Sequence, residues 1–316
     1  MKVFDHVRMW MPALGVAAYL VMLVGLPDVE VVVSKQFYTY VVIGALALFV
    51  VLAVLSYPIK RLRQAMVYRG PWWFGLVVLL GIYEVATLKT GSLPLPFFPS
   101  ATKISETFMA DHQILVECIF ASLKVLFWGF LVGTVLGIIN GVVLGLFEKF
   151  RYWADPIFRF IGPTPPAALA PVALIIAPSS FVAAVFLIVF SVWYPVTVQT
   201  LSGVTNLSKD YFEVARTFGG DRLYQLRHIV LPGILPTVFF GIYIGFCYSF
   251  MTLIVADMMG STSGLGWFIN WSLGWGAYYR LYAALLIIAL MCFLLIGGLF
   301  KLRDRMLRWQ GEGVSI

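Results

Sequence analysis

Residues 123–147 read LKVLFWGFLVGTVLGIINGVVLGLF, an apolar run in which Lys124 is the only charged side chain. An α-helix needs about 20 mostly apolar residues to cross the hydrocarbon core of a bilayer. This run is long enough to do so, and it therefore predicts a transmembrane helix. The class of the protein follows from this run and from the others like it.

The same run carries a glycine at every fourth position, from Gly129 through Gly133, Gly137 and Gly141 to Gly145. One face of the predicted helix is therefore bare backbone. Small residues in that arrangement let membrane helices approach closely, because their association depends on van der Waals fit. We interpret the glycine face as a contact with another helix of this chain, with a wall of a solute path as the alternative.

Similar apolar runs extend along the whole chain, which is 61% hydrophobic and 12% charged over 316 residues. The sequence therefore predicts an all-α, polytopic transmembrane helical bundle with eight crossings. Seven crossings remain an alternative, because 11–26 is short and 165–178 contains four prolines, which remove helix hydrogen bonds. Besides 123–147, the predicted crossings are 11–26, 37–57, 71–88, 165–178, 181–201, 233–256 and 281–300.

The basic residues predict the orientation of these crossings. With eight crossings, 17 of the 22 Lys and Arg residues fall in segments that share one side of the membrane. Such residues resist translocation, so this side is predicted to be the cytoplasm and to hold both termini. The net charge of +7 is then explained by a basic cytoplasmic rim, without a nucleic-acid partner.

The chain is predicted to have two parts. Residues 1–70 contain two crossings and a basic linker, so they form an additional N-terminal helical hairpin, whereas residues 71–316 form a core of six crossings. Within the core, an amphipathic stretch from Ala101 to Cys118 is expected to lie along the outer interface, capped by Ser100 or Thr102.

A mostly polar segment, 213–232, lies between two crossings on the predicted cytoplasmic side. Asp210 is expected to cap a short helix, Gly219 and Gly220 to end it, and Asp221 to cap a second short helix. Two short helices at an angle would form a rigid knob. Its apolar positions, which we expect to contact a partner, are Tyr211, Phe212, Val214, Ala215 and Phe218.

The spacing within this segment is Glu-x-Ala-x-x-x-Gly, then nine residues, then Ile-x-Leu-Pro. Here the chain resembles the inner-membrane permease subunits of type I ATP-binding-cassette importers, although Val214 stands where that family usually has alanine. The resemblance extends from about Leu93 to the C-terminus. Further landmarks resemble the nitrate, taurine, alkanesulfonate and bicarbonate branch; they are Asp155-Pro156, the proline run 163–171 and Gly264-Leu-Gly266.

The resemblance implies that the segment 206–230 couples the chain to a separate ATPase. It also implies two ATPase subunits that hold ATP and Mg, and a second permease copy in a homodimer, with a close relative as the alternative partner. An extracytoplasmic solute-binding protein and a location in the lipids of the inner membrane are implied as well. The implied cargo is a small anion, with a vitamin precursor as the alternative. The implied coupling residues are Glu213, Ala215, Arg216, Phe218, Gly219, Gly220, Asp221, Ile229, Leu231 and Pro232.

The sequence does not predict an enzyme. It has no Gly-Lys dipeptide and hence no phosphate-binding loop, so ATP hydrolysis is assigned to another polypeptide, and no cofactor is expected on this chain. The three histidines and three cysteines are too dispersed to predict a metal site.

Polar residues inside membrane segments are costly and suggest a solute path. The candidates for the translocation path are Glu84, Asn140, Gln199 and Asp257. Glu84 has the alternative of reaching the interface, and Asp257 has the alternatives of shaping an outer gate or making a structural hydrogen bond. These residues also leave open a self-sufficient channel or secondary transporter.

Overall fold

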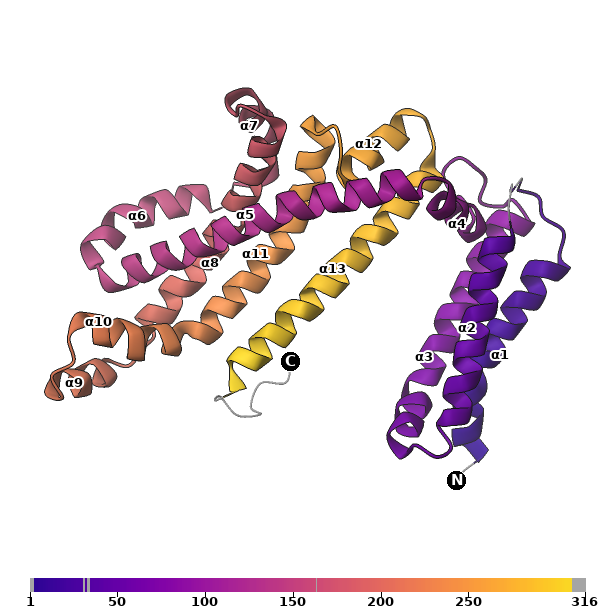
Figure 1. Ribbon diagram of the computed structural model, residues 1–316, viewed down its shortest axis with the longest axis horizontal. Coiled ribbons are helices and arrows are strands. Elements are labelled where there is room, and N and C mark those ends of the chain that lie inside the picture. Colours follow the sequence, from indigo (N-terminus) through magenta and orange to yellow (C-terminus); the bar gives the residue numbers. More distant parts are fainter. Residues whose placement is uncertain (1–2, 31, 33–34, 163, 309–316) are drawn as a thin grey trace. The chain divides into compact units, whose positions relative to one another are not determined.

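Figure 1 shows the computed structural model, which describes residues 3–308 except 31, 33–34 and 163. The described chain is helical throughout and contains no strand, which confirms the all-α prediction. Pro163 of the proline run lies outside the described residues. Seven of the described helices are long and apolar enough to cross a membrane.

The chain divides into two compact units. One unit comprises Met1–Gln113 with Ser272–Ala283, and the other comprises Ile114–Trp271 with Ala284–Ile316. Residue 70 lies inside a helix, Lys60–Glu84, so the predicted basic linker is the first part of that helix. Its Lys, Arg, Leu, Gln, Ala and Met residues are good helix formers, which explains why no loop forms there.

Three long helices form the first unit: α1 (Val3–Gly25), α2 (Gln36–Leu55) and α3 (Lys60–Glu84). Helices α1 and α3 run in the same direction, because Gly70 faces Arg8 and, further along, Gly81 faces Tyr19. Helix α2 makes the return between them and packs on both. A π-helical turn, η1 (Val85–Lys89), extends α3.

The predicted amphipathic stretch 101–118 is divided in the structure. Helix α4 (Ala101–Ala110) ends before Asp111, and α5 (His112–Leu146) begins after it. Ser100 caps α4, since its hydroxyl accepts a hydrogen bond of 3.1 Å from the backbone N–H of Lys103.

The second unit is built around α8 (Ser180–Thr205), which contacts α5 on one side and α11 (Leu231–Gly260) on the other. Its other elements are α6 (Glu148–Ile161), η2 (Pro166–Leu169), α7 (Ala170–Ile176), α9 (Lys209–Thr217), α10 (Arg222–Gln225) and η3 (Leu226–Val230). It also contains most of α12 (Leu265–Gly274) and of α13 (Tyr278–Met306), whose end and beginning, respectively, belong to the first unit.

The glycine face of α5 contacts α8, which confirms the interpretation of that face as a helix contact within the chain. A Cβ atom on Gly137 would lie 2.7 Å from the Cβ of Val196, and one on Gly145 would lie 2.5 Å from the Cβ of Val204. Each glycine faces the residue 59 positions later, the other pairs being Gly129 with Ile188, Gly133 with Val192 and Gly141 with Thr200. The constant offset means that α5 and α8 are parallel.

Because α5 and α8 are parallel, the chain between them must travel back along their length. From Gly129 to Gly145 the contact extends over about 24 Å at 1.5 Å per residue, close to the thickness of the hydrocarbon core. The return is made in pieces by α6, η2 and α7.

The prediction of a continuous crossing at 165–178 is therefore wrong, because only the short apolar segment Pro166–Ile176 forms there. Pro165, Pro166 and Pro171 lack the N–H groups that a continuous helix would need. The described residues contain seven candidate spans, and the chain between α5 and α8 consists of the shorter elements α6, η2 and α7.

Candidate functional site

The candidate coupling site is the segment that joins α8 to α11, and its first helix is α9. Ser208 is the N-cap residue: its hydroxyl accepts a hydrogen bond of 3.3 Å from the backbone N–H of Asp210. The prediction that Asp210 caps this helix is wrong, because Asp210 lies in the first turn, where its carboxylate accepts a hydrogen bond from Ser208. A carboxylate there also faces the positive end of the helix dipole.

Gly219 ends α9, as the sequence predicts. Its φ of +78° lies in the left-handed region, which an L-residue with a side chain enters only at a cost. The turn is closed by hydrogen bonds from the N–H of Gly219 to the carbonyl of Arg216 and from the N–H of Gly220 to the carbonyl of Ala215. A Cβ atom on Gly219 would meet nothing within 4 Å, so backbone conformation alone calls for glycine.

Asp221 begins the next helix, and its carboxylate accepts a hydrogen bond of 2.7 Å from the backbone N–H of Tyr224. This cap confirms the prediction. The second helix is not short, however, since α10, η3 and α11 continue without a break from Arg222 to Gly260. The side chain of Gln225 also donates a hydrogen bond of 3.0 Å to the carbonyl of Gly220. The predicted knob thus consists of α9 and the first turns of the long helix Arg222–Gly260 that follows it.

Two sides of α9 have different roles. Phe212 packs against a cluster formed by Val204, Val230, Ile234 and Val238 at the ends of α8 and α11. Ala215 is 7% exposed, so it also faces inward. The expectation that all five apolar positions contact a partner is therefore wrong for these two, because Phe212 anchors α9 to its own chain and Ala215 is buried.

The outward side of α9 presents large apolar groups. Tyr211 and Val214 are exposed, and Phe218 is 88% exposed. Exposed apolar patches on a rigid element mark sites of interaction. Of the other predicted coupling residues, Glu213, Arg216 and Asp221 are exposed, Ile229 is half-buried, and Leu231 and Pro232 lie exposed in the first turn of α11.

Asn140 and Gln199 lie at one level of the second unit, since they are separated by the same 59 positions that relate α5 to α8. They face different neighbours. Asn140 lines a cavity of about 320 Å³ between α5 and α6, together with Trp153, Phe158 and Trp193. Gln199 packs its Cβ and Cγ atoms against Gly241 of α11.

Asp257 is buried and joins three helices. Ser122 of α5 donates a hydrogen bond of 2.6 Å to its carboxylate, and the hydroxyl of Ser122 accepts one of 2.8 Å from the N–H of Leu265, where α12 begins. Gly264 has a φ of +126°, and a Cβ there would lie 2.5 Å from the Oδ2 of Asp257. The Gly-Leu-Gly landmark thus makes room for a buried carboxylate.

Replacing Ser122 with alanine is expected to lower the stability of the second unit by about 2–3 kcal/mol, because it leaves the carboxylate of Asp257 and the N–H of Leu265 without this partner. Thermal unfolding of the purified chain in detergent measures the effect. The matched control is Ser249→Ala. Ser249 is equally buried but donates to the carbonyl of Phe246 in its own helix. Equal shifts in the two variants would contradict the prediction.

Glu84 belongs to the first unit and contacts the start of α4. Its carboxylate accepts hydrogen bonds from the backbone N–H groups of Ala101 and Thr102, at 2.8 and 3.2 Å, and from the hydroxyl of Thr102 at 2.5 Å. A buried carboxylate at a helix N-terminus satisfies free N–H groups and is stabilised by the helix dipole. These contacts account for a buried Glu84 without a solute.

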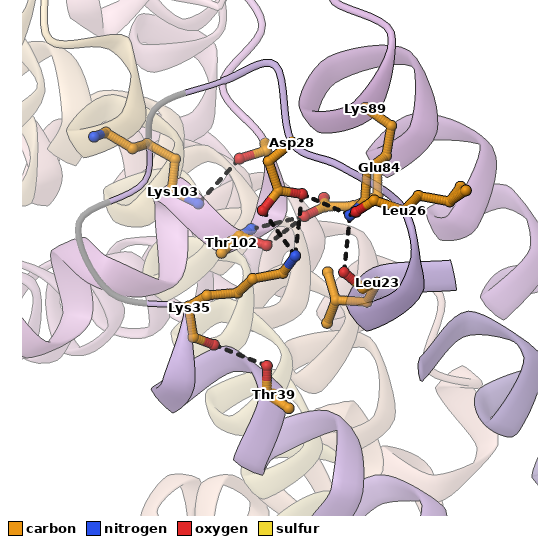
Figure 2. A network of polar contacts seen from close by, with 10 residues as sticks. Leu23, Leu26, Asp28, Lys35, Thr39, Glu84, Lys89, Thr102 and Lys103 are labelled. Atoms are coloured by element: carbon orange, nitrogen blue, oxygen red, sulfur yellow. Dashed lines mark hydrogen bonds and ion pairs between the residues drawn. The ribbon is translucent and has the colours of Figure 1, made fainter. Parts of the chain in front are cut away.

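Figure 2 shows a second polar network of the first unit, which the sequence analysis missed. Lys89 is buried, and its ammonium group donates to Asp28 at 2.5 Å and to the carbonyls of Leu23 and Leu26 at 2.8 and 2.6 Å. Asp28 also accepts a hydrogen bond of 2.8 Å from Lys35. Burial opposes ionisation of Asp28, but the two ammonium groups outweigh it and lower its pKa. The sequence did contain a signal for this ion pair, since Lys89 follows the apolar run 71–88 and Asp28 follows the apolar run 11–26.

Replacing Asp28 with asparagine is expected to cost about 1–3 kcal/mol, because it leaves the buried ammonium of Lys89 without its counter-charge. Since the folded-state pKa of Asp28 is lowered, its contribution is present above the unfolded pKa of about 4 and is lost as the pH falls below that. Hydrogen exchange of residues 20–30 between pH 3 and pH 7 measures this loss. The control Lys35→Gln removes the more exposed partner and is expected to cost under about 1 kcal/mol.

Comparison with known proteins gives three findings. The family model for the binding-protein-dependent transport system inner membrane component matches residues 133–308. The taurine transport system permease protein of Escherichia coli is 30% identical over 245 residues, which cover 75% of this chain and 88% of that protein. The bicarbonate transport system permease protein of Synechococcus elongatus is 32% identical over 190 residues, 60% of this chain and 66% of that protein.

Among solved structures, the fold is similar to a chain of the MetNI methionine ABC transporter in an inward-facing conformation. The TM-score is 0.52 with 16% identity, and the match covers 61% of this chain and 96% of that chain. At this identity the similarity concerns the fold alone.

Proposed function

Because the chain belongs to the family of binding-protein-dependent transport system inner membrane components, the permease subunits of ATP-binding-cassette importers, we propose that it carries a small anion and is driven through the segment 213–232. The family works with ATPase subunits and a binding protein. The chain is a membrane component, consistent with a translocation subunit that performs no chemistry of its own.

The observation that carries the coupling proposal is the rigid, outward-facing side of α9. Tyr211, Val214 and Phe218 are exposed, while Phe212 holds the helix to α8 and α11 and Ala215 is buried. An ATPase subunit that binds the outward side of α9 would therefore move the adjoining ends of α8 and α11 together. A flexible loop would absorb such a motion instead. ATP and Mg belong to that subunit.

The proposed cargo is a small oxyanion such as a sulfonate, nitrate or bicarbonate. The names of the related taurine and bicarbonate permeases support this class. Asn140 and Gln199 are proposed to line the path near its middle, because amide groups hydrogen-bond an oxyanion without adding charge. Asp257 is proposed to hold the α11–α12 turn beside the path, since its carboxylate is occupied by Ser122.

We propose that Glu84 anchors the start of α4 and does not line the translocation path, because its carboxylate already accepts three hydrogen bonds. Two copies of the chain, each with both termini in the cytoplasm, are proposed to enclose the path. ATP binding would shift the population between an inward-facing and an outward-facing state, and hydrolysis would reset it.

Reconstitution tests this function. The chain is placed in liposomes alone, with its ATPase subunits, and with the ATPase subunits and the binding protein, and uptake of labelled taurine, nitrate and bicarbonate is measured. Uptake of one of them only in the complete, ATP-supplied system is expected. Flux through the chain alone would instead indicate a channel or secondary transporter, and ATP-driven uptake restricted to a vitamin precursor would overturn the proposed cargo.

A further inference from the structure

The first unit places two arginines at the same level where α1 and α3 are in contact. The backbones touch there, since a Cβ atom on Gly70 would clash with the carbonyl oxygen of Arg8. Arg69, next to Gly70, therefore lies at the level of Arg8, and both side chains are exposed. Two cations at one helix contact repel each other unless an anion lies between or beside them.

The chain supplies little negative charge at this end of the unit. Helix α3 contains no acidic residue before Glu84, and the only one in α1 is Asp5. In the part of the chain that the structure describes, no carboxylate forms an ion pair with Arg69, Lys60 or Arg61. The exposed cations at this end of the unit, Arg8, Lys60, Arg61 and Arg69, have no ion pair within the described residues. This basic surface, as we call it, is thus left to an external anion.

Aromatic side chains place this basic surface at the surface of the membrane. Tyr68 is 85% exposed and Trp72 is 63% exposed, on the same side of α3 as Arg61. Such rings are enriched at the level of lipid headgroups. The span Lys60–Lys89 has 30 residues, about 45 Å of helix, whereas the hydrocarbon core is about 30 Å thick. The first turns of α3 therefore project from the hydrocarbon into the headgroup layer.

We propose that Arg8 and Arg69 bind the phosphate of an acidic phospholipid, with Lys60 and Arg61 strengthening the attraction to neighbouring headgroups. The planar guanidinium group matches phosphate geometry and donates two parallel hydrogen bonds to it. Tyr68 and Trp72 pack against the glycerol and upper acyl region of the same lipids. The occupant is a lipid rather than a soluble phosphate, because the rings beside the arginines are exposed and apolar.

The test measures which lipids stay with the chain. The full chain is extracted from bilayers of equal phosphatidylglycerol and phosphatidylcholine, and the bound lipids are quantified by mass spectrometry. Each basic residue near an anionic surface strengthens the attraction about fivefold, so we expect wild type to retain several times more phosphatidylglycerol. The double variant R8Q/R69Q is expected to lower the ratio several-fold, with Lys60 and Arg61 maintaining a smaller preference.

Two further variants make the result specific. K301Q/R305Q removes two exposed cations from the end of α13 and is expected to lower the ratio much less than R8Q/R69Q does, because it removes only general attraction and no paired arginines. R8K/R69K keeps both charges without the planar fork and is expected to be intermediate, which also provides a folded variant if R8Q/R69Q is unstable. Equal lipid ratios in wild type and R8K/R69K would overturn the bidentate contact between guanidinium and phosphate, because positive charge alone would then be sufficient. An unchanged ratio in R8Q/R69Q, an equal loss in K301Q/R305Q, or displacement of the lipid by soluble glycerol phosphate would overturn it.

Discussion

Replacing Gly137 with leucine is expected to abolish folding of the second unit, or to lower its stability by about 3 kcal/mol or more. The first atom of the new side chain would lie 2.7 Å from the Cβ of Val196 and 3.0 Å from the carbonyl oxygen of Trp193. Neither atom can move aside, because one belongs to a buried side chain and the other to the backbone of α8. The yield of monodisperse protein and its thermal midpoint in detergent measure the effect.

The matched control is Gly44→Leu in α2, where a Cβ atom would meet nothing within 4 Å. It adds the same side chain to a membrane helix and is expected to leave the yield unchanged. A second test pairs Gly137→Ala with Val196→Gly, which moves the missing Cβ from one helix to the other. Partial recovery relative to Gly137→Ala alone is expected. Equal yields for Gly137→Leu and Gly44→Leu would contradict the close packing of α5 on α8.

Replacing Gly219 with valine is expected to reduce ATP-driven uptake by at least about tenfold while the chain still folds. A left-handed conformation costs a residue with a side chain about 1–2 kcal/mol, and a β-branched one more. Nothing lies near the position, so the strain is relieved by unwinding the last turn of α9, which moves Phe218. Uptake and ATP hydrolysis, measured together in the reconstituted complex, show whether coupling or assembly is lost.

Gly219→Asn is the control, because asparagine tolerates the left-handed conformation better than other residues that have a side chain. It adds a larger polar group at the same exposed place, and uptake within about threefold of wild type is expected. If valine and asparagine reduced uptake equally, the size of the side chain rather than the backbone conformation would matter. Normal uptake by Gly219→Val would show that the segment 213–232 does not depend on this turn for coupling.

The contrast between these two glycines shows how far the sequence could predict the site. Gly219 was predictable because a helix end is a local event, decided by Gly219 and the cap residue Asp221 within a few positions. The partner of Gly137 was not predictable, because periodicity predicts a close contact without identifying the helix that makes it. The inward orientation of Phe212 was missed for the same reason, since its burial depends on Val204 and Val230.

By itself, the sequence determined that this protein is an all-α membrane protein, since apolar length fixes which segments can cross a bilayer, and short-range spacing fixes the turn at Gly219. Its resemblance to importer permeases indicated the function. The tertiary structure decided which helices and residues of the chain contact one another. It set α5 parallel to α8 through contacts such as Gly137 with Val196, and it broke the return segment 148–176 into pieces. It also assigned Glu84 to the start of α4. Local patterns record the periodicity and caps of one segment, whereas burial and polar satisfaction depend on residues that only folding brings together.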